Sequence, residues 1–105
     1  GQGDAAIERL RESVAVDPTS AAAWNALGMT PGGNNRLSEA EQAFREAMTR
    51  DATNHHYVFN LGLALQRQGR GAESRPYFEK SLQLNPGFAP AREELRKLAD
   101  DRSRR

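Results

Sequence analysis

The segment RPYFEKSLQLNPGFAPAREELRKL, from Arg75 to Leu98, contains the pattern that decides the fold. Its second half carries apolar residues at helical spacing, namely Phe88, Ala91, Leu95 and Leu98. The residues LNPGF in its middle separate two helices, because a proline cannot continue a helix that precedes it. The segment therefore predicts a helix, a tight connection and a second helix.

The same arrangement occurs earlier in the chain. The breaks VDPTS and RDATN interrupt other apolar stripes, and Ser20 and Asn54 follow these breaks as candidate N-caps. No segment alternates apolar and polar residues for long, so strands are not expected. The sequence therefore predicts an all-α chain. The earlier stripes consist of Ala6, Leu10 and Val14, and of Ala40, Phe44, Ala47 and Met48.

The breaks recur with a constant spacing of 34 residues, as Pro18, Ala52 and Pro86 show. A fixed period of this length in a helical chain predicts stacked helical hairpins, each one a repeat of the last. Further pairs share this spacing: Leu27 with Leu61, Gly28 with Gly62, Asn35 with Gly69, and Phe44 with Phe78.

The chain resembles the tetratricopeptide repeat family, whose signature has this period. One repeat carries Trp24, Leu27, Gly28, Ala40, Phe44 and Ala47 at signature positions, and the next carries Leu61, Gly62, Phe78 and Pro86. The resemblance implies an all-α, right-handed superhelical stack of antiparallel helix hairpins, with about two and a half repeats and a C-terminal capping helix.

The register predicts a single domain over residues 1–105. Because the sequence starts within a repeat, we expect it to be a piece of a longer array. The expected parts are an unpaired helix at 4–16, a repeat at 20–50 with helices 20–30 and 37–50, a repeat at 54–84 with helices 54–68 and 71–84, and a capping helix at 88–101.

Composition argues against several classes of function. The 15 lysines and arginines nearly balance the 14 acidic residues, which gives no reason to expect nucleic acid or an anionic membrane. There is no cysteine, and the only histidines, His55 and His56, point about 100° apart on a helix. No apolar run approaches a membrane span. We therefore expect a soluble, non-enzymatic chain without membrane insertion, metal or other cofactor.

The resemblance implies a concave groove, lined by the first helix of each hairpin, that binds a peptide or a partner protein. Phe59 and Leu63 are the candidate apolar anchors, although both could instead pack on a neighbouring helix. A subclass of the family grips terminal carboxylates, and Asn60 alone matches that pattern here. The predicted groove residues are Asn25, Met29, His56, Phe59, Leu63, Gln66 and Arg67.

Self-association is the alternative function. The helix at 4–16 lacks its hairpin partner, so we expect the stripe of Ile7, Leu10 and Val14 to be uncovered and to form an oligomer edge. Hairpins could also be exchanged between chains at the glycine-rich segment 31–35.

This segment, PGGNN, interrupts the first hairpin, where the second reads LQRQG at 65–69. Pro31 and the two glycines disfavour helix, which predicts that the preceding helix ends near Met29 or Thr30 and that 31–35 is non-helical. We expect Asn35 to form the turn, because asparagine tolerates the left-handed conformation.

The family's large side chain, usually tyrosine, is missing at position 31. Its absence predicts a notch near Leu61 and Leu65 on the second hairpin. We interpret the segment first as a neutral local defect. The two alternatives are a gap that admits a partner segment and a hinge for hairpin exchange.

Overall fold

The structure is a computed structural model that describes residues 2–31 and 34–103. It contains six α-helices, and no strand occurs in these two ranges, which confirms the predicted all-α class. The helices are α1 (Gln2–Val16), α2 (Ala21–Met29), α3 (Asn34–Arg50), α4 (His55–Arg67), α5 (Gly71–Leu84) and α6 (Ala89–Ser103).

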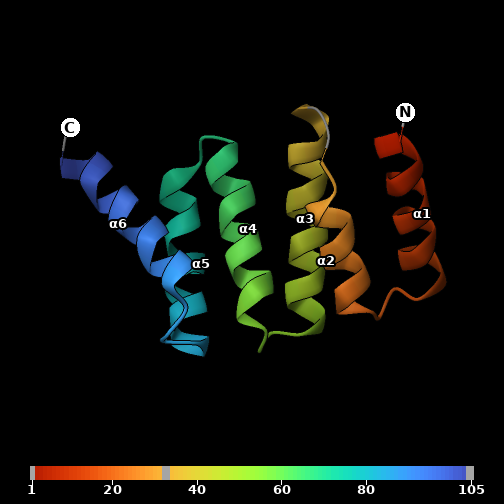
Figure 1. The fold of residues 1–105 in the computed structure, drawn as a ribbon. Helices are drawn as coiled ribbons and strands as arrows, with labels where there is room; N and C mark the ends of the chain where they lie inside the picture. Colours follow the sequence, from red (N-terminus) through yellow and green to blue (C-terminus); the bar gives the residue numbers. More distant parts are fainter. Residues whose placement is uncertain (1, 32–33, 104–105) are drawn as a thin grey trace.

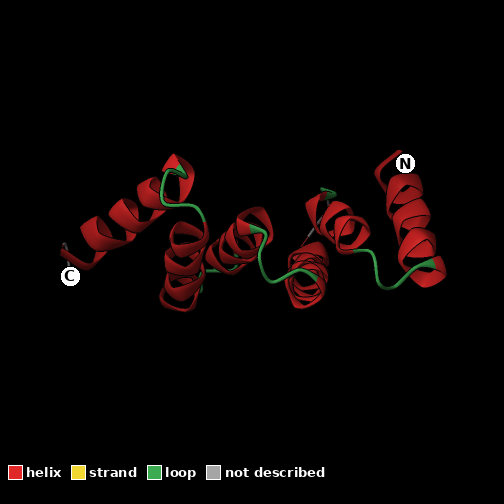
Figure 2. Cartoon of the chain, turned by 90° about the horizontal axis from the view of Figure 1, so that it is seen from below, coloured by secondary structure: helices red, strands yellow, loops and turns green. Residues whose placement is uncertain are grey.

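The helices follow one another along an elongated stack, with the ends of the chain at opposite ends (Figure 1). Seen from below, they alternate in a zigzag, as stacked hairpins do (Figure 2). Each helix packs mainly on the helices before and after it in the chain. The stack measures 44 × 28 × 18 Å. The predicted solenoid of helical hairpins is therefore confirmed.

Local signals set several helix starts. The Ser20 side chain accepts a hydrogen bond from the Ala23 backbone N–H at 3.1 Å, and Asn54 accepts one from His56 at 2.9 Å. Both residues are the N-caps of their helices, as predicted. These side chains satisfy backbone donors that the first turn of a helix leaves free.

Two glycines allow the helices of each hairpin to approach closely. A methyl carbon built on Gly28 would lie 2.6 Å from Phe44 Cε1, and one built on Gly62 would lie 2.7 Å from Phe78 Cε1. Both rings are buried. A larger residue at either glycine would therefore force an aromatic ring out of the interior, which is why the signature requires glycine at these positions.

Buried apolar side chains form two clusters along the stack. The first joins α1 to the hairpin α2–α3, and the second joins α3 to α4. The clusters comprise Ile7, Val14, Leu27 and Ala43, and then Ala40, Phe44, Leu61, Ala64 and Leu65.

The structure corrects the prediction for segment 31–35. Helix α2 ends at Met29, as expected, but α3 begins at Asn34 instead of at residue 37. Relative to the second hairpin, α2 is four residues shorter than α4, and α3 is three residues longer than α5. The inter-helix turn has moved by about one helical turn toward the N-terminus. Residues 32 and 33 lie outside the described residues.

The prediction for Asn35 was also wrong. Asn35 lies inside α3, and no described residue other than glycine has a positive φ. Gly69, its counterpart 34 residues later, has φ 78° and makes the turn of the second hairpin. The physical reason is that asparagine costs at most about 0.7 kcal/mol relative to alanine in a helix, far less than proline, so α3 can begin as soon as the proline and glycines are passed.

Candidate functional site

The predicted groove residues lie on α2 and α4, the first helices of the two hairpins. Asn60 of α4 donates a hydrogen bond to Asn25 Oδ1 of α2 at 2.9 Å. The Asn25 amide in turn donates to Met29 Sδ at 3.3 Å. Met29 itself is 64% exposed. The bond between Asn25 and Asn60 therefore holds the two first helices side by side, with an exposed thioether next to it.

Two of the groove residues, Phe59 and His56, lie beside α6. The Phe59 ring is half-buried, with its centroid 5.5 Å from that of Phe78 and 5.1 Å from that of Phe88. His56 is exposed, and its ring centroid lies 5.3 Å from that of Phe88. The contacts of Phe59 agree with the alternative that it packs between neighbouring elements. Its role as a binding anchor stays a prediction.

The imidazole rings of His55 and His56 lie closer together than their directions on a helix, about 100° apart, led us to expect. The two ring centroids are 4.1 Å apart, because both rings pack edge-on against Phe88. Burial and, to a lesser extent, the charge of His56 lower the pKa of His55. The described ranges contain no group of three or more histidine, cysteine or acidic side chains that could hold a metal ion.

Gln66 and Arg67, at the end of α4, differ in their surroundings. Gln66 donates a hydrogen bond to Glu94 of α6 at 2.8 Å, which extends the row of first helices to α6. Arg67 is exposed, and its guanidinium makes no hydrogen bond or ion pair with any residue in 2–31 or 34–103. An unpaired cation therefore stands on this face.

A pocket of about 510 Å³ opens where α2 stops. It lies beside α4, as the missing side chain at position 31 predicted, but Leu61 and Leu65 do not line it. Both are fully buried, because they face the core between α3 and α4. The α2-end pocket is lined by residues 28–31, by Arg36, Leu37, Ala40 and Phe44 of α3, and by Asn60, Leu63 and Arg67 of α4.

Arg36 stabilises the shortened end of α2. In a continuous helix, the carbonyl of Leu27 would accept from the N–H of residue 31, but Pro31 has none. The Thr30 N–H and Arg36 Nη2 donate to this carbonyl instead, and Nη2 also donates to the Thr30 carbonyl at 3.1 Å. The Thr30 hydroxyl donates to the carbonyl of Ala26 at 3.0 Å. Side chains thus replace the missing backbone donors.

The Arg36 guanidinium is almost completely buried at the pocket wall, with a residue exposure of 8%. Its Nη1 lies 3.0 Å from Glu39 Oε1, and its Nε has no hydrogen-bond partner among the described residues. Glu39 also binds Arg11 at 2.7 Å. The hydrogen bond from Arg11, assisted by the charge of Arg36, lowers the pKa of Glu39.

Sequence analysis did not identify Arg36 as part of the site. The signal was present, because Pro31 leaves the carbonyl four residues before it without a backbone donor. That signal does not identify which side chain replaces the donor, since the answer depends on where α3 begins.

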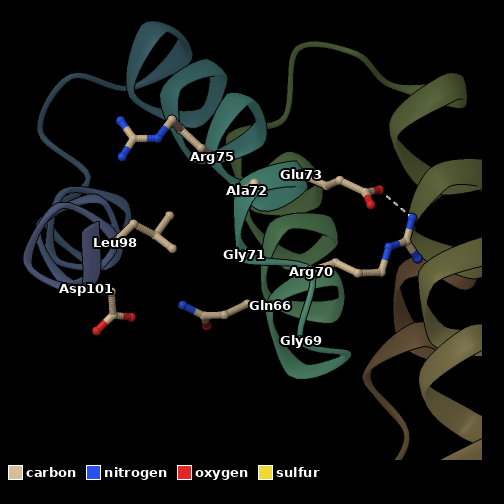
Figure 3. A pocket seen from close by; sticks show the side chains of 9 residues that line it. All are labelled: Gln66, Gly69, Arg70, Gly71, Ala72, Glu73, Arg75, Leu98 and Asp101. Carbon is tan, nitrogen blue, oxygen red and sulfur yellow. Dashed lines mark hydrogen bonds and ion pairs between the residues drawn. The ribbon is translucent and has the colours of Figure 1, made fainter. Parts of the chain in front are cut away.

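A larger hollow, of about 850 Å³, lies between the α4–α5 turn and α6 (Figure 3). Leu98 of α6 points into it, and Arg70 is joined to Glu73 at 2.6 Å beside it. Arg70 also binds Glu41 at 2.7 Å, and Gln66 is bonded to Glu94. Arg75 and Asp101 also line the hollow and bind no other described residue, but their charges are opposite, so the lining carries no net charge that would select a ligand.

The expected exposure of the α1 stripe was wrong. Ile7 and Val14 are each only 7% exposed, and they pack against Leu27 and Ala43. Leu10 lies at the edge of the same cluster. The hairpin α2–α3 covers the stripe, because α1 lies against it as the second helix of a preceding repeat would. Oligomerisation through this edge stays a prediction, without the uncovered stripe that motivated it.

Within the described residues, no helix is long and apolar enough to cross a membrane. The comparisons with known proteins begin with curated sequences. Residues of this chain are 36% identical over 56 positions to cellulose synthase 1 operon protein C of Komagataeibacter xylinus. That match covers 53% of this chain but only 4% of the relative. The chain thus spans only a small part of the length of that relative.

Solved structures match over nearly the whole chain. MamA superposes with a TM-score of 0.90 at 25% identity, over 98% of this chain and 60% of MamA. The second TPR domain of human RPAP3, solved in complex with an HSP70 peptide, gives a TM-score of 0.85 at 27% identity. That match covers 94% of this chain and 82% of the RPAP3 chain.

Two consecutive segments, residues 21–54 and 56–88, match family models described as the tetratricopeptide repeat. The matched segments coincide with the two hairpins whose close contacts between glycine and phenylalanine are described above. Together with the stacked hairpins of the structure, these matches show that the chain belongs to the tetratricopeptide repeat family.

Proposed function

We propose that this chain is a non-catalytic protein-interaction module whose first-helix face binds an extended segment of a partner protein. The observation that carries the proposal is the α2-end pocket, which opens between α2 and α4 beside two exposed side chains, Met29 and Arg67. Met29 is 64% exposed and Arg67 is unpaired among the described residues. Exposed apolar and charged groups around a hollow are typical of a binding surface.

The comparisons support this proposal. The RPAP3 domain that is 27% identical to this chain was solved with a bound HSP70 peptide. Its fold matches along 94% of this chain, which supports a binding surface of the same kind. Asn25 and Gln66 are already bonded to Asn60 and Glu94, and Phe59 packs against Phe78 and Phe88. These contacts favour a rigid surface that needs little ordering when a segment binds.

The test is a selection of random nine-residue peptides, displayed between two spacers, against the intact chain. Peptides that are enriched are synthesised, and their affinities are measured by fluorescence anisotropy. Met29→Ala and His56→Ala should each weaken binding, because both side chains are exposed on the proposed face. Leu84→Ala is the matched control, since Leu84 is an exposed apolar residue on α5, a second helix.

Circular dichroism must show that each variant is folded. If no peptide is enriched, or if Leu84→Ala weakens binding as much as Met29→Ala does, the first-helix face is not the binding surface. The alternative, self-association through α1, is tested by light scattering at several concentrations. A strict monomer would exclude it.

A further inference from the structure

The α2-end pocket combines an apolar interior with positive charge. Leu37, Ala40 and Phe44 of α3 line one side, and Leu63 of α4 faces them from the other side. These side chains offer carbon surface to a ligand and few polar partners, so an aliphatic side chain suits the interior.

Two guanidinium groups stand at this apolar interior. Arg67 is exposed and unpaired among the described residues, while Arg36 is buried with its Nε free of any described partner. No acidic side chain is among the described residues that line the pocket. Glu39, the carboxylate bound to Arg36, is also held by Arg11, and Arg11 in turn binds Glu8 at 2.8 Å, so these four charges balance one another. The uncompensated charge at the pocket is therefore that of Arg67, which favours an anionic group on the ligand.

We propose that the α2-end pocket takes an aliphatic side chain of the partner segment, and that an aspartate or glutamate close to it on the same segment binds Arg67 beside Arg36. The inference rests on the proposed function and specifies the chemistry of its ligand. A guanidinium can hold a carboxylate through two parallel hydrogen bonds, which fixes both the position and the direction of the segment.

The carboxylate is that of a side chain rather than a chain terminus. Asn60 alone matches the pattern by which a subclass of the family grips terminal carboxylates. One of its two amide N–H groups donates to Asn25 at 2.9 Å, which leaves a single neutral donor for a ligand. That donor serves the side-chain carboxylate of an internal acidic residue as well as a C-terminal carboxylate.

The broken helix is what makes this subsite. If α2 continued for one more turn beyond Met29, as α4 does, its backbone and side chains would extend along the edge of the pocket that Thr30 and Pro31 line. Replacing residues 31–35 with LQRQG, the sequence of the second hairpin, should therefore close the pocket while the fold is kept.

The experiment uses the displayed nine-residue library, in which no peptide has a free C-terminus. Enriched peptides should carry leucine, isoleucine, valine or methionine within two positions of aspartate or glutamate. In the strongest peptide, changing the acid to its amide should weaken binding by about 10-fold or more, as expected for a lost charge-assisted hydrogen bond. Arg67→Gln should weaken binding by a similar factor.

A double-mutant cycle identifies the contact. If Arg67 binds the peptide carboxylate, the two changes together should weaken binding little more than either one alone. Arg67→Glu should weaken binding further, and higher salt should reduce the affinity of the wild type more than that of Arg67→Gln. Arg9→Glu, an exposed charge reversal on α1, should leave the affinity unchanged.

Failure of this inference can be distinguished from failure of the proposed function. Peptides that bind through Met29 and His56 but ignore Arg67, or whose acidic residue can be changed to its amide without loss of affinity, would overturn the inference alone. The same holds if the LQRQG variant keeps full affinity. Absence of any enriched peptide would overturn both.

Discussion

Replacing Arg36 with methionine should destabilise the chain because Arg36 substitutes for the backbone donor that Pro31 lacks. Methionine keeps an unbranched apolar stem and removes only the guanidinium. Arg36 Nη2 donates to the carbonyls of Leu27 and Thr30. Hydrogen bonds to charged groups contribute about 1.5–3 kcal/mol each, but Leu27 keeps a weaker bond from the Thr30 N–H. We therefore expect a loss of about 2 kcal/mol in the free energy of unfolding.

The decisive measurement repeats this substitution in the LQRQG variant of residues 31–35. There, residue 31 regains its N–H, and the backbone should bond the Leu27 carbonyl. Arg36→Met should then cost less than about 0.5 kcal/mol, so the two changes should be coupled by about 1.5 kcal/mol. Urea unfolding followed by far-UV circular dichroism gives both values, because a domain of this size has a total stability of about 5–15 kcal/mol.

Arg70→Met is the matched control. Arg70 lies 34 residues after Arg36, but it binds the side chains of Glu41 and Glu73 instead of helix carbonyls. Its replacement should have the same small effect in both backgrounds. If Arg36→Met costs as much in the LQRQG variant as in the wild type, Arg36 does not replace the missing donor, and the reasoning is refuted.

Four other outcomes can be measured. The LQRQG change alone should raise the free energy of unfolding by about 1–2 kcal/mol, because α2 gains a turn while α3 loses one; an unchanged urea midpoint would contradict this. Gly28→Ala should cost about 1–3 kcal/mol, since its methyl would clash with the Phe44 ring, and a neutral melt would show that the ring can move. Phe59→Ala should lower stability by about 2 kcal/mol besides any effect on binding, so affinities must be compared well below the melting temperature. The pKa of His55 is lowered in the fold, so the contribution of His55 to the free energy of unfolding is complete above the unfolded pKa of about 6.5 and is lost as pH falls below that value. His55→Asn should therefore flatten the dependence of stability on pH, and an unchanged slope would exclude His55 as the source of that dependence.

The sequence alone determined the repeat, because its signals are local. Pro18 and Pro86 lie between helices, and the polar caps Ser20 and Asn54 stand at the starts of α2 and α4. Gly28 and Gly62 lie 34 residues apart, as do Phe44 and Phe78. This shared spacing predicted where the two helices of each hairpin approach each other. The positions of the candidate groove residues on α2 and α4 followed from the same register, although their role in binding is still a prediction.

Only the tertiary structure decided how the chain responds to its broken helix. Local propensity predicted that α2 would end near Met29 or Thr30, but α2 and α3 compete for the residues that follow, and the outcome depends on distant partners. The helix start at Asn34 brings Arg36 to the carbonyl of Leu27, nine residues earlier. Similarly, the burial of Ile7 depends on Leu27 and Ala43, which are remote from it in the sequence. Such contacts arise from packing between helices, and the periodicity of a single helix does not specify them.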